Sequence, residues 1–169
     1  MPVRTAQPDD AAAVAEVHVR AWQAAYRGLM ADEFLDSLRP EDRAARYRFA
    51  APDPDAPETL VVTDTAGAIA GFATVAPARD DDRSGTGEVC ALYVDPPAWG
   101  SGMGLALMQA ARARLVELGF TQAGLWVLVG NDRAQRFYRR DGWTADGARR
   151  TDQVWGVRVD EVRFVRSLI

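Results

Sequence analysis

The chain opens with a short alternating run of apolar and polar residues and then changes to helical spacing. The alternation predicts a strand over residues 3–6. Asp9 or Asp10 can cap a following helix that runs to about Tyr26. Four apolar residues of that helix fall on one face: Val14, Val17, Ala21 and Ala25. We therefore expect a strand followed by an amphipathic helix.

Helical and extended patterns then follow one another to the end of the chain. Further helices are expected over 31–50, interrupted near Pro40, over 102–118 with Gly119 as its C-cap, and over 131–140. Strands are expected over 59–65, 68–76, 88–94, 123–129, 143–150 and 157–168, with loops over 51–57 and 79–87. The first two of these strands form a hairpin, and the alternation of the last one breaks after Val159. This order predicts one α/β (α+β) domain over residues 1–169 with a mixed sheet.

Composition narrows the class of protein. The chain has 169 residues, of which 48% are hydrophobic and 26% charged, as in an ordinary soluble globular domain. No apolar run reaches the roughly 20 residues that span a bilayer, and the first residues lack the apolar segment of a signal peptide. We expect a cytoplasmic protein with no membrane partner.

The charged and metal-binding side chains exclude several chemistries. All 20 basic residues are arginine, so no lysine can serve as a Walker lysine or form a Schiff base. The net charge of −4 without a dense basic block argues against nucleic acid as a partner. One cysteine (Cys90) and one histidine (His18) exclude a disulfide framework and a His/Cys zinc site. No metal is expected.

The stretch VDPPAWGSGMG, residues 94–104, is a glycine-rich turn between a predicted strand and a predicted helix. Such a turn presents backbone N–H groups to an anion. A dinucleotide fingerprint starting at Gly100 needs glycine or alanine at position 105, where Leu105 stands. A P-loop needs a lysine that the chain lacks. Both of these alternatives are disfavoured.

Two motifs resemble those of the GCN5-related N-acetyltransferase (GNAT) family. The pattern [Q/R]-x-x-G-x-[G/A] falls on the six residues Trp99, Gly100, Ser101, Gly102, Met103 and Gly104, and only Trp99 departs from it. The pattern N-x-x-A-x-x-F-Y-x-x-x-G-[F/W] is matched by Asn131, Ala134, Phe137, Tyr138, Gly142 and Trp143. The resemblance covers essentially the whole chain. It implies a mostly antiparallel sheet flanked by helices, and an N-acetyltransferase that uses acetyl-CoA.

The resemblance also implies a set of site residues. The amides from Gly100 to Leu105 would hold the pyrophosphate, and Asn131 and Ala134 would contact the pantetheine arm. Tyr138 would act as the acid for the leaving thiolate and Glu88 as the base for the amine. A backbone N–H of Leu92, Tyr93 or Val94 would bind the thioester oxygen. Cys90 is expected to be buried and inert, so we expect direct transfer in a ternary complex.

The acceptor side is less constrained by the sequence. Trp22 and Tyr26 share a helix face with His18 and are candidates for binding the acceptor; packing in the core is the alternative for both aromatics. His18 is either a second candidate base or a surface residue. A primary amine of a small molecule is the expected acceptor. The alternatives are the N-terminus of a peptide, or a coenzyme A-binding regulatory module without turnover, and the resemblance suggests a homodimer.

Overall fold

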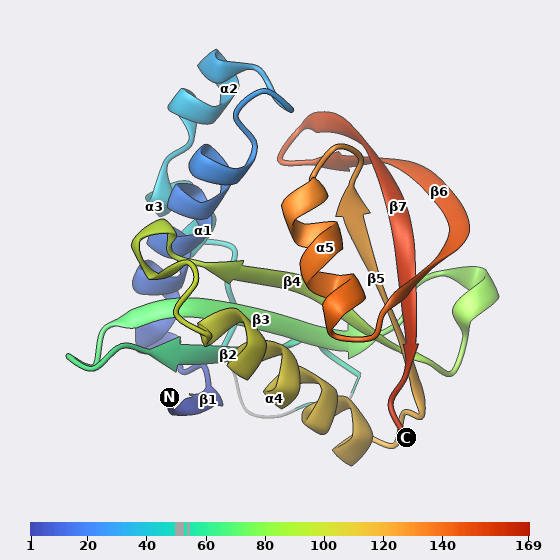
Figure 1. Cartoon of the computed structure of the whole chain (residues 1–169). Coiled ribbons are helices and arrows are strands. Elements are labelled where there is room, and N and C mark those ends of the chain that lie inside the picture. Colours follow the sequence, from blue (N-terminus) through green and yellow to red (C-terminus); the bar gives the residue numbers. More distant parts are fainter. Residues whose placement is uncertain (50–52, 54) are drawn as a thin grey trace.

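A single seven-stranded sheet runs through the chain (Figure 1). The structure is a computed structural model, and it describes residues 1–49, 53 and 55–169. The strands are β1 (Val3–Thr5), β2 (Glu58–Thr63), β3 (Ile69–Pro77), β4 (Gly87–Val94), β5 (Gln122–Leu128), β6 (Thr144–Val154) and β7 (Val157–Ser167). They lie in the order β1-β2-β3-β4-β5-β7-β6, and only β4 and β5 pair in parallel. The expected mixed, mostly antiparallel sheet is confirmed.

Helices cover both faces of this sheet. They are α1 (Ala11–Ala25), α2 (Asp32–Ser37), α3 (Pro40–Ala44), α4 (Met103–Glu117) and α5 (Asp132–Arg140). Figure 1 shows α4 in front of β2 and β3 and α1 behind them. The strand sequence explains this arrangement, since successive side chains point to opposite faces. Val61 packs in the cluster that contains Val14 and Val17 of α1, whereas Val62 packs with Leu107 of α4.

Several local predictions need correction. The region 31–50 forms two short helices, α2 and α3, and the chain from 45 to 49 is not helical; position 50 lies outside the described residues. Positions 51, 52 and 54 of the expected loop also lie outside them. The expected loop over 79–87 contains a 3₁₀ turn at Asp81–Arg83, and its last residue already belongs to β4. Asp10 does not cap α1: its carboxylate accepts the N–H of Gln7 at 2.7 Å and pairs with Arg4.

The last two strands form a hairpin that differs from the sequence prediction. The second strand, β7, is continuous, and the irregularity lies in β6 between Ala145 and Arg149. The apparent break in alternation arises because both faces of β7 are covered: Val159 packs in the cluster of Trp22 and Tyr26, whereas Phe164 packs on the opposite face with Tyr138. At the tip, Trp155 (φ 51°) and Gly156 (φ 79°) both have left-handed backbone conformations, the geometry of a two-residue type I′ turn. A bulky residue in this region is strained, so the tip holds Trp155 in an unusual position.

Candidate active site

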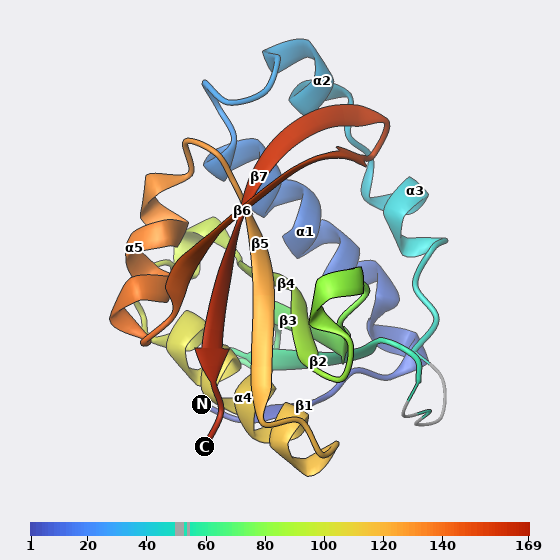
Figure 2. The same ribbon diagram turned by 90° about the vertical axis from the view of Figure 1, so that its right-hand side faces the viewer.

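A long cleft of about 1360 Å³ lies where β4 and β5 separate. One end is formed by the glycine turn and α5, and the other by α1, α3 and the β6–β7 hairpin. In Figure 2 the tip of that hairpin lies on the same side of the molecule as α3, and α5 lies on the opposite side. The cleft therefore joins two regions, one suited to the donor and the other to the acceptor.

The cleft exists because two parallel strands pair over only two positions. β4 and β5 pair at Gly87 with Ala123 and at Glu88 with Gly124, and then diverge. On the other edge of β4 the register with β3 shifts between Thr74 and Val75, which leaves Cys90 as an extra, bulged residue. Beyond Glu88, the edge of β4 that faces β5 has no strand partner in the described part of the chain. Its backbone groups are available to a ligand.

Backbone directions show which groups of β4 face the cleft. The N–H of Asp95 donates to the carbonyl of Ala70 (2.8 Å), so it points toward β3. Because N–H groups alternate in direction along a strand, that of Tyr93 also points toward β3, and those of Leu92 and Val94 point toward the cleft. The carbonyl of Val94 supports this assignment, since it accepts from Trp99 Nε1 at 2.8 Å. Of the three N–H groups predicted from sequence, that of Tyr93 is wrongly placed; its side chain lines the cleft instead.

The glycine turn has the backbone shape that anion binding requires. Gly100 (φ 79°) and Gly102 (φ 90°) are left-handed, which favours glycine at both positions. Gly102 is the N-cap of α4, so the first N–H groups of that helix are exposed at the turn. Of the predicted turn residues, Gly100, Gly102, Gly104 and Leu105 line the cleft. The Ser101 and Met103 side chains do not: Ser101 Oγ donates to Ala98 (2.6 Å), and Met103 is part of the core.

Trp99 departs from the family pattern, and the structure shows how its side chain is used. Its indole N–H is bonded to Val94, and its ring lies 3.7 Å from the guanidinium carbon of Arg133 on α5. Burial lowers the pKa of Arg133, and no carboxylate pairs with it in the part of the chain that the structure describes. A cation from α5 thus lies beside position 99, where the family pattern has glutamine or arginine. Arg133 had no distinguishing signal in the sequence.

Four motif residues of α5 and its N-cap line the cleft: Asn131, Ala134, Phe137 and Tyr138. Asn131 Oδ1 accepts the N–H of Ala134 at 3.2 Å, so Asn131 caps the N-terminus of α5. Tyr138 is 9% exposed, and burial raises the pKa of its phenol well above the usual value. Its hydroxyl has no hydrogen-bond partner among the described residues. It can therefore donate to a ligand in the cleft.

Two carboxylates lie near the point where β4 and β5 separate. Glu88 is 4% exposed; its Oε1 is buried without a hydrogen-bond partner among the described residues, and its Oε2 lies 3.7 Å from Arg79. It lies just beneath the wall of the cleft rather than on it. Glu161 on β7 does line the cleft, and burial raises its pKa, although Arg150 at 3.0 Å counteracts that effect. Glu161 has no distinguishing signal in the sequence, because it resembles any other charged residue of an alternating strand.

The environment expected for Cys90 is wrong. It is exposed at the wall of the cleft rather than buried. Poor solvation between the cleft walls and the nearby Glu88 carboxylate nevertheless raise the pKa of its thiol to about 12. A thiol with that pKa stays protonated at neutral pH and is a poor nucleophile. Poor solvation beside a carboxylate thus disfavours the thiolate, and the inertness of Cys90 stays a prediction.

Aromatic side chains dominate the acceptor end of the cleft. Trp22 and Tyr26 are buried but also contribute to its lining, so the core and cleft interpretations both hold. The Tyr26 and Tyr93 hydroxyls are 3.3 Å apart. His18 is 4% exposed, not a surface residue, and its Nδ1 lies 2.6 Å from the hydroxyl of Tyr47. Burial, with a smaller contribution from the charge of a nearby arginine, holds the pKa of His18 well below 6.5.

The wall that faces α1 comes from α3 and the tip of the β6–β7 hairpin, which no sequence motif connects to the site. The ring of Trp155 lies 4.7 Å from that of His18 and 4.2 Å from that of Trp22. Arg43 of α3 covers Trp155, with its guanidinium carbon 4.7 Å from the ring centre. A Trp-Gly pair flanked by Val154 and Val157 is a signal for a two-residue hairpin turn. That signal predicts the turn but not what its tip contacts.

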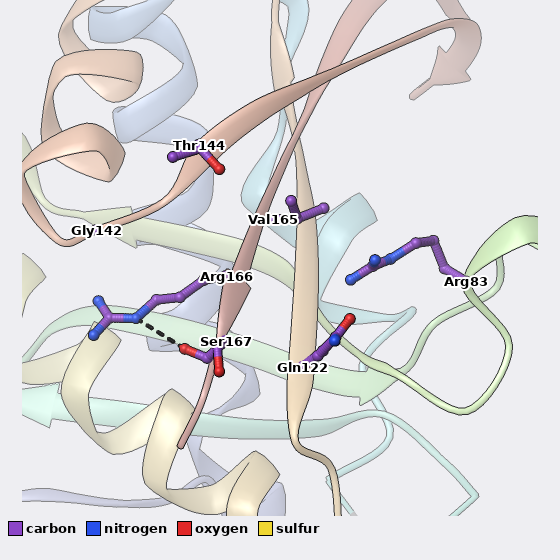
Figure 3. A pocket seen from close by; sticks show the side chains of 7 residues that line it. All are labelled: Arg83, Gln122, Gly142, Thr144, Val165, Arg166 and Ser167. Atoms are coloured by element: carbon purple, nitrogen blue, oxygen red, sulfur yellow. Dashed lines mark hydrogen bonds between the residues drawn. The ribbon is translucent and has the colours of Figure 1, made fainter.

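A second pocket, of about 250 Å³, lies apart from the cleft (Figure 3). It is lined by Arg83, Gln122, Gly142, Thr144, Val165, Arg166 and Ser167. Figure 3 shows Arg166 donating to the carbonyl of Ser167, and the Arg166 guanidinium also pairs with Asp141 at 3.2 Å. This pocket is too small for a nucleotide-containing ligand, and none of the motif side chains that point into the cleft reaches it.

Within residues 1–49, 53 and 55–169, no group of three or more His, Cys, Asp or Glu side chains is arranged to hold a metal ion. None of the helices in this part of the chain has the length and apolar character needed to cross a bilayer.

Comparison with known proteins agrees with the geometry. Rv2669 of Mycobacterium tuberculosis, named as an uncharacterized N-acetyltransferase, is 31% identical to this chain. The match covers 95% of this chain and 99% of the length of Rv2669. Two solved structures share the fold. PaiA N-acetyltransferase of Thermoplasma acidophilum, in complex with coenzyme A, is 17% identical with a TM-score of 0.73, and the match covers 98% of both chains. YncA of Salmonella typhimurium, a putative acetyltransferase solved with acetyl-CoA, is 22% identical with a TM-score of 0.72, and the match covers 100% of this chain and 94% of YncA. The model of the acetyltransferase (GNAT) family matches residues 14–143. The chain therefore belongs to the GNAT acetyltransferase family.

Proposed function

We propose that this protein transfers the acetyl group of acetyl-CoA directly to a primary amine, within a ternary complex. One observation carries the proposal: the free N–H groups of β4, the glycine turn and the unpartnered Tyr138 hydroxyl all face the same cleft. Thioester aminolysis needs these three features, since it requires an anchor for the donor, donors for the oxyanion and a group beside the leaving sulfur.

The donor end would bind acetyl-CoA mainly through the backbone. The N–H groups of Gly102, Gly104 and Leu105 at the start of α4 suit the pyrophosphate, and Arg133 beside Trp99 adds a positive charge. The pantetheine arm would then run between β4 and β5, past Asn131 and Ala134. The N–H groups of Leu92 and Val94 would bind the arm and the thioester oxygen.

The reaction forms one bond and breaks another. The amine nitrogen attacks the thioester carbon, the N–C bond forms, and the C–S bond breaks as the tetrahedral intermediate collapses. The nitrogen loses a proton to a carboxylate, and the departing sulfur accepts a hydrogen bond from Tyr138. Because burial raises the pKa of Tyr138 above that of a thiol, it stabilises the thiolate by donation, and full proton transfer is uphill.

The base is one of two carboxylates. Glu88 is the residue to which the family resemblance points, and it lies where β4 and β5 separate. Glu161 lines the cleft itself and has a raised pKa, which suits a group that must accept a proton near neutral pH. A base that acts directly must reach the amine, so exposure in the cleft favours Glu161, whereas Glu88 would act through water.

The alternatives are weaker on specific grounds. A coenzyme A-binding regulatory module has no use for an unpartnered buried hydroxyl, so Tyr138 favours an enzyme. The N-terminus of a peptide is the second candidate acceptor. A homodimer stays a prediction from the family resemblance.

The test is to follow thiol release from acetyl-CoA with a panel of amines, including amino acids, polyamines, aminoglycosides and short peptides. Calorimetry measures acetyl-CoA binding in parallel. We expect turnover with one amine class, and a larger loss of kcat for Glu161→Gln than for Glu88→Gln. The reverse order would assign the base to Glu88. Failure to bind acetyl-CoA would contradict the whole proposal.

A further inference from the structure

We propose that the acceptor is an amine that also carries a carboxylate on an apolar body, as a free aromatic or large aliphatic amino acid does, and that Arg43 binds the carboxylate. This inference rests on the proposed transfer reaction and names the substrate class of the same cleft. It concerns the end of the cleft formed by α1, α3 and the β6–β7 hairpin.

Arg43 is a cation without an anion. Its guanidinium carbon lies 4.7 Å from the ring centre of Trp155 and 5.8 Å from that of Tyr47, and its Nε is buried without a hydrogen-bond partner among the described residues. No carboxylate of the described chain lies within 4.0 Å of it. Arg79 and Arg150, which also line the cleft, are paired with Glu88 and Glu161. Arg46 and Arg48 line it without an ion pair among the described residues, but both are exposed to solvent, unlike Arg43. A partly buried, unpaired guanidinium is costly unless an anion occupies the site.

The carboxylate of Glu161 lines the same cleft as Arg43. The pKa of Tyr93 is raised mainly by burial, but Glu161 also raises it and Arg43 lowers it, so both charges act on this phenol. Tyr93 belongs to the stretch of β4 whose neighbouring N–H groups face the cleft. A cation and a carboxylate thus line the same cleft, and both lie near Tyr93. An amino acid carries the complementary pair, an amine and a carboxylate a short distance apart.

The walls between these charges suit an apolar body. His18, Tyr47, Tyr93 and Trp155 all line this end, and the rings of Tyr93 and Trp155 each lie 4.7 Å from that of His18. His18 stays neutral because its pKa is depressed, so it adds no charge to the wall. Trp155 lies in the strained turn at the hairpin tip, which is on the side of α3 (Figure 2), and its ring contacts Arg43 of that helix. A polycation would be repelled by Arg43, and a peptide N-terminus has an amide where the carboxylate is needed.

The experiment compares acceptors that differ only in the carboxylate. The protein is assayed with acetyl-CoA and each proteinogenic amino acid. The best of these is then compared with its decarboxylated amine, its amide and its dipeptide with a C-terminal glycine. Arg43→Met keeps most of the apolar stem and removes the charge, and Arg43→Lys keeps a charge without the planar fork. Arg158→Met, an exposed arginine near the hairpin that does not line the cleft, is the matched control.

We expect the amino acid to have the highest kcat/KM. Arg43→Met should raise its KM about 10- to 100-fold, the effect of losing a charge-assisted hydrogen bond, with no effect on the amine. Arg43→Lys should lose less, and Arg158→Met nothing. Equal or better use of the amine, amide or dipeptide, or no effect of Arg43→Met, would overturn the inference while the transferase function stands.

Calorimetry separates the two proposals if no amine is acetylated. The protein loaded with coenzyme A is titrated with the same amino acids and amines. Binding that needs both the carboxylate and Arg43 would support this site and contradict the transfer function. Absence of such binding would overturn the inference.

Discussion

Replacing Tyr138 with phenylalanine removes one hydroxyl from the cleft and leaves the rest of the site in place. In the described structure this hydroxyl has no hydrogen-bond partner, so the substitution leaves no protein group unpaired. The ring packs with Phe137 and Phe164, at centroid distances of 5.5 and 6.2 Å, and phenylalanine keeps both contacts. The free energy of unfolding should therefore change by no more than about 0.5 kcal/mol.

Activity should respond far more strongly than stability. A donor that stabilises charge developing in the transition state contributes about 10²–10³ in kcat. We expect kcat to fall about 100-fold or more, because the departing thiolate would lose its hydrogen bond, while the Kd of acetyl-CoA stays within about threefold. Because the pKa of Tyr138 is raised well above 10, the phenol stays protonated through pH 9, and the mutant should keep the pH profile of the wild type.

The assay is thiol release at saturating acetyl-CoA, with calorimetry for binding and thermal unfolding for stability. Tyr26→Phe is the matched control, since it also removes a phenol hydroxyl from the cleft wall, but one that lies 3.3 Å from the hydroxyl of Tyr93. It should lower stability by about 1 kcal/mol, or the Tm by about 2–4 °C, and change kcat less. An unchanged kcat in Tyr138→Phe would refute a role for this hydroxyl beside the sulfur. A fall in Tm larger than that of Tyr26→Phe would assign it to the fold instead.

Two further predictions concern His18 and the glycine turn. Burial holds the pKa of His18 below the unfolded value of 6.5, so the folded protein keeps this side chain neutral. As the pH falls, the unfolded state binds a proton that the folded state does not, and stability is lost. Between pH 7.5 and 5.5 the free energy of unfolding, measured with urea, should fall by about 1.4 kcal/mol in the wild type, and His18→Gln should lack this fall. An equal loss in both proteins would contradict this. Gly102 has a φ of 90°, so Gly102→Ala should distort the turn and weaken acetyl-CoA binding about tenfold in calorimetry. The control Gly104→Ala should keep the fold and the turn, because its Cβ would meet Phe137 at an ordinary contact distance of 3.6 Å. Equal binding by the two variants would show that the backbone of the turn is not needed.

The family and the donor half of the cleft could be predicted from the sequence because they depend on local features. Gly100 and Gly102 adopt backbone angles that favour glycine, and Asn131 caps a helix within its own turn. Tyr138 follows Asn131 at a spacing that a helix converts into one face. Each of these relations spans a few residues, so a motif can record it.

The wrong or missing predictions involve contacts between distant segments. The sequence does not show that Cys90 is a bulged residue at the wall of the cleft, since that depends on the register between β3 and β4. It also does not show that the break in alternation near Val159 arises because both faces of β7 are covered. The burial of His18 is also not visible in the sequence, because it comes from partners that follow His18 by 29 residues or more, such as Tyr47 and Trp155.

By itself, the sequence determined the order of elements, the glycine turn, the helix that carries Tyr138, and the absence of lysine chemistry. Only the tertiary structure decided which N–H groups of β4 face the cleft, that Glu161 reaches it, and that Arg43 meets Trp155 across more than 100 residues. The physical reason is that periodicity and turn chemistry act within a few residues. Strand register, burial and the pairing of charges depend on segments brought together by folding.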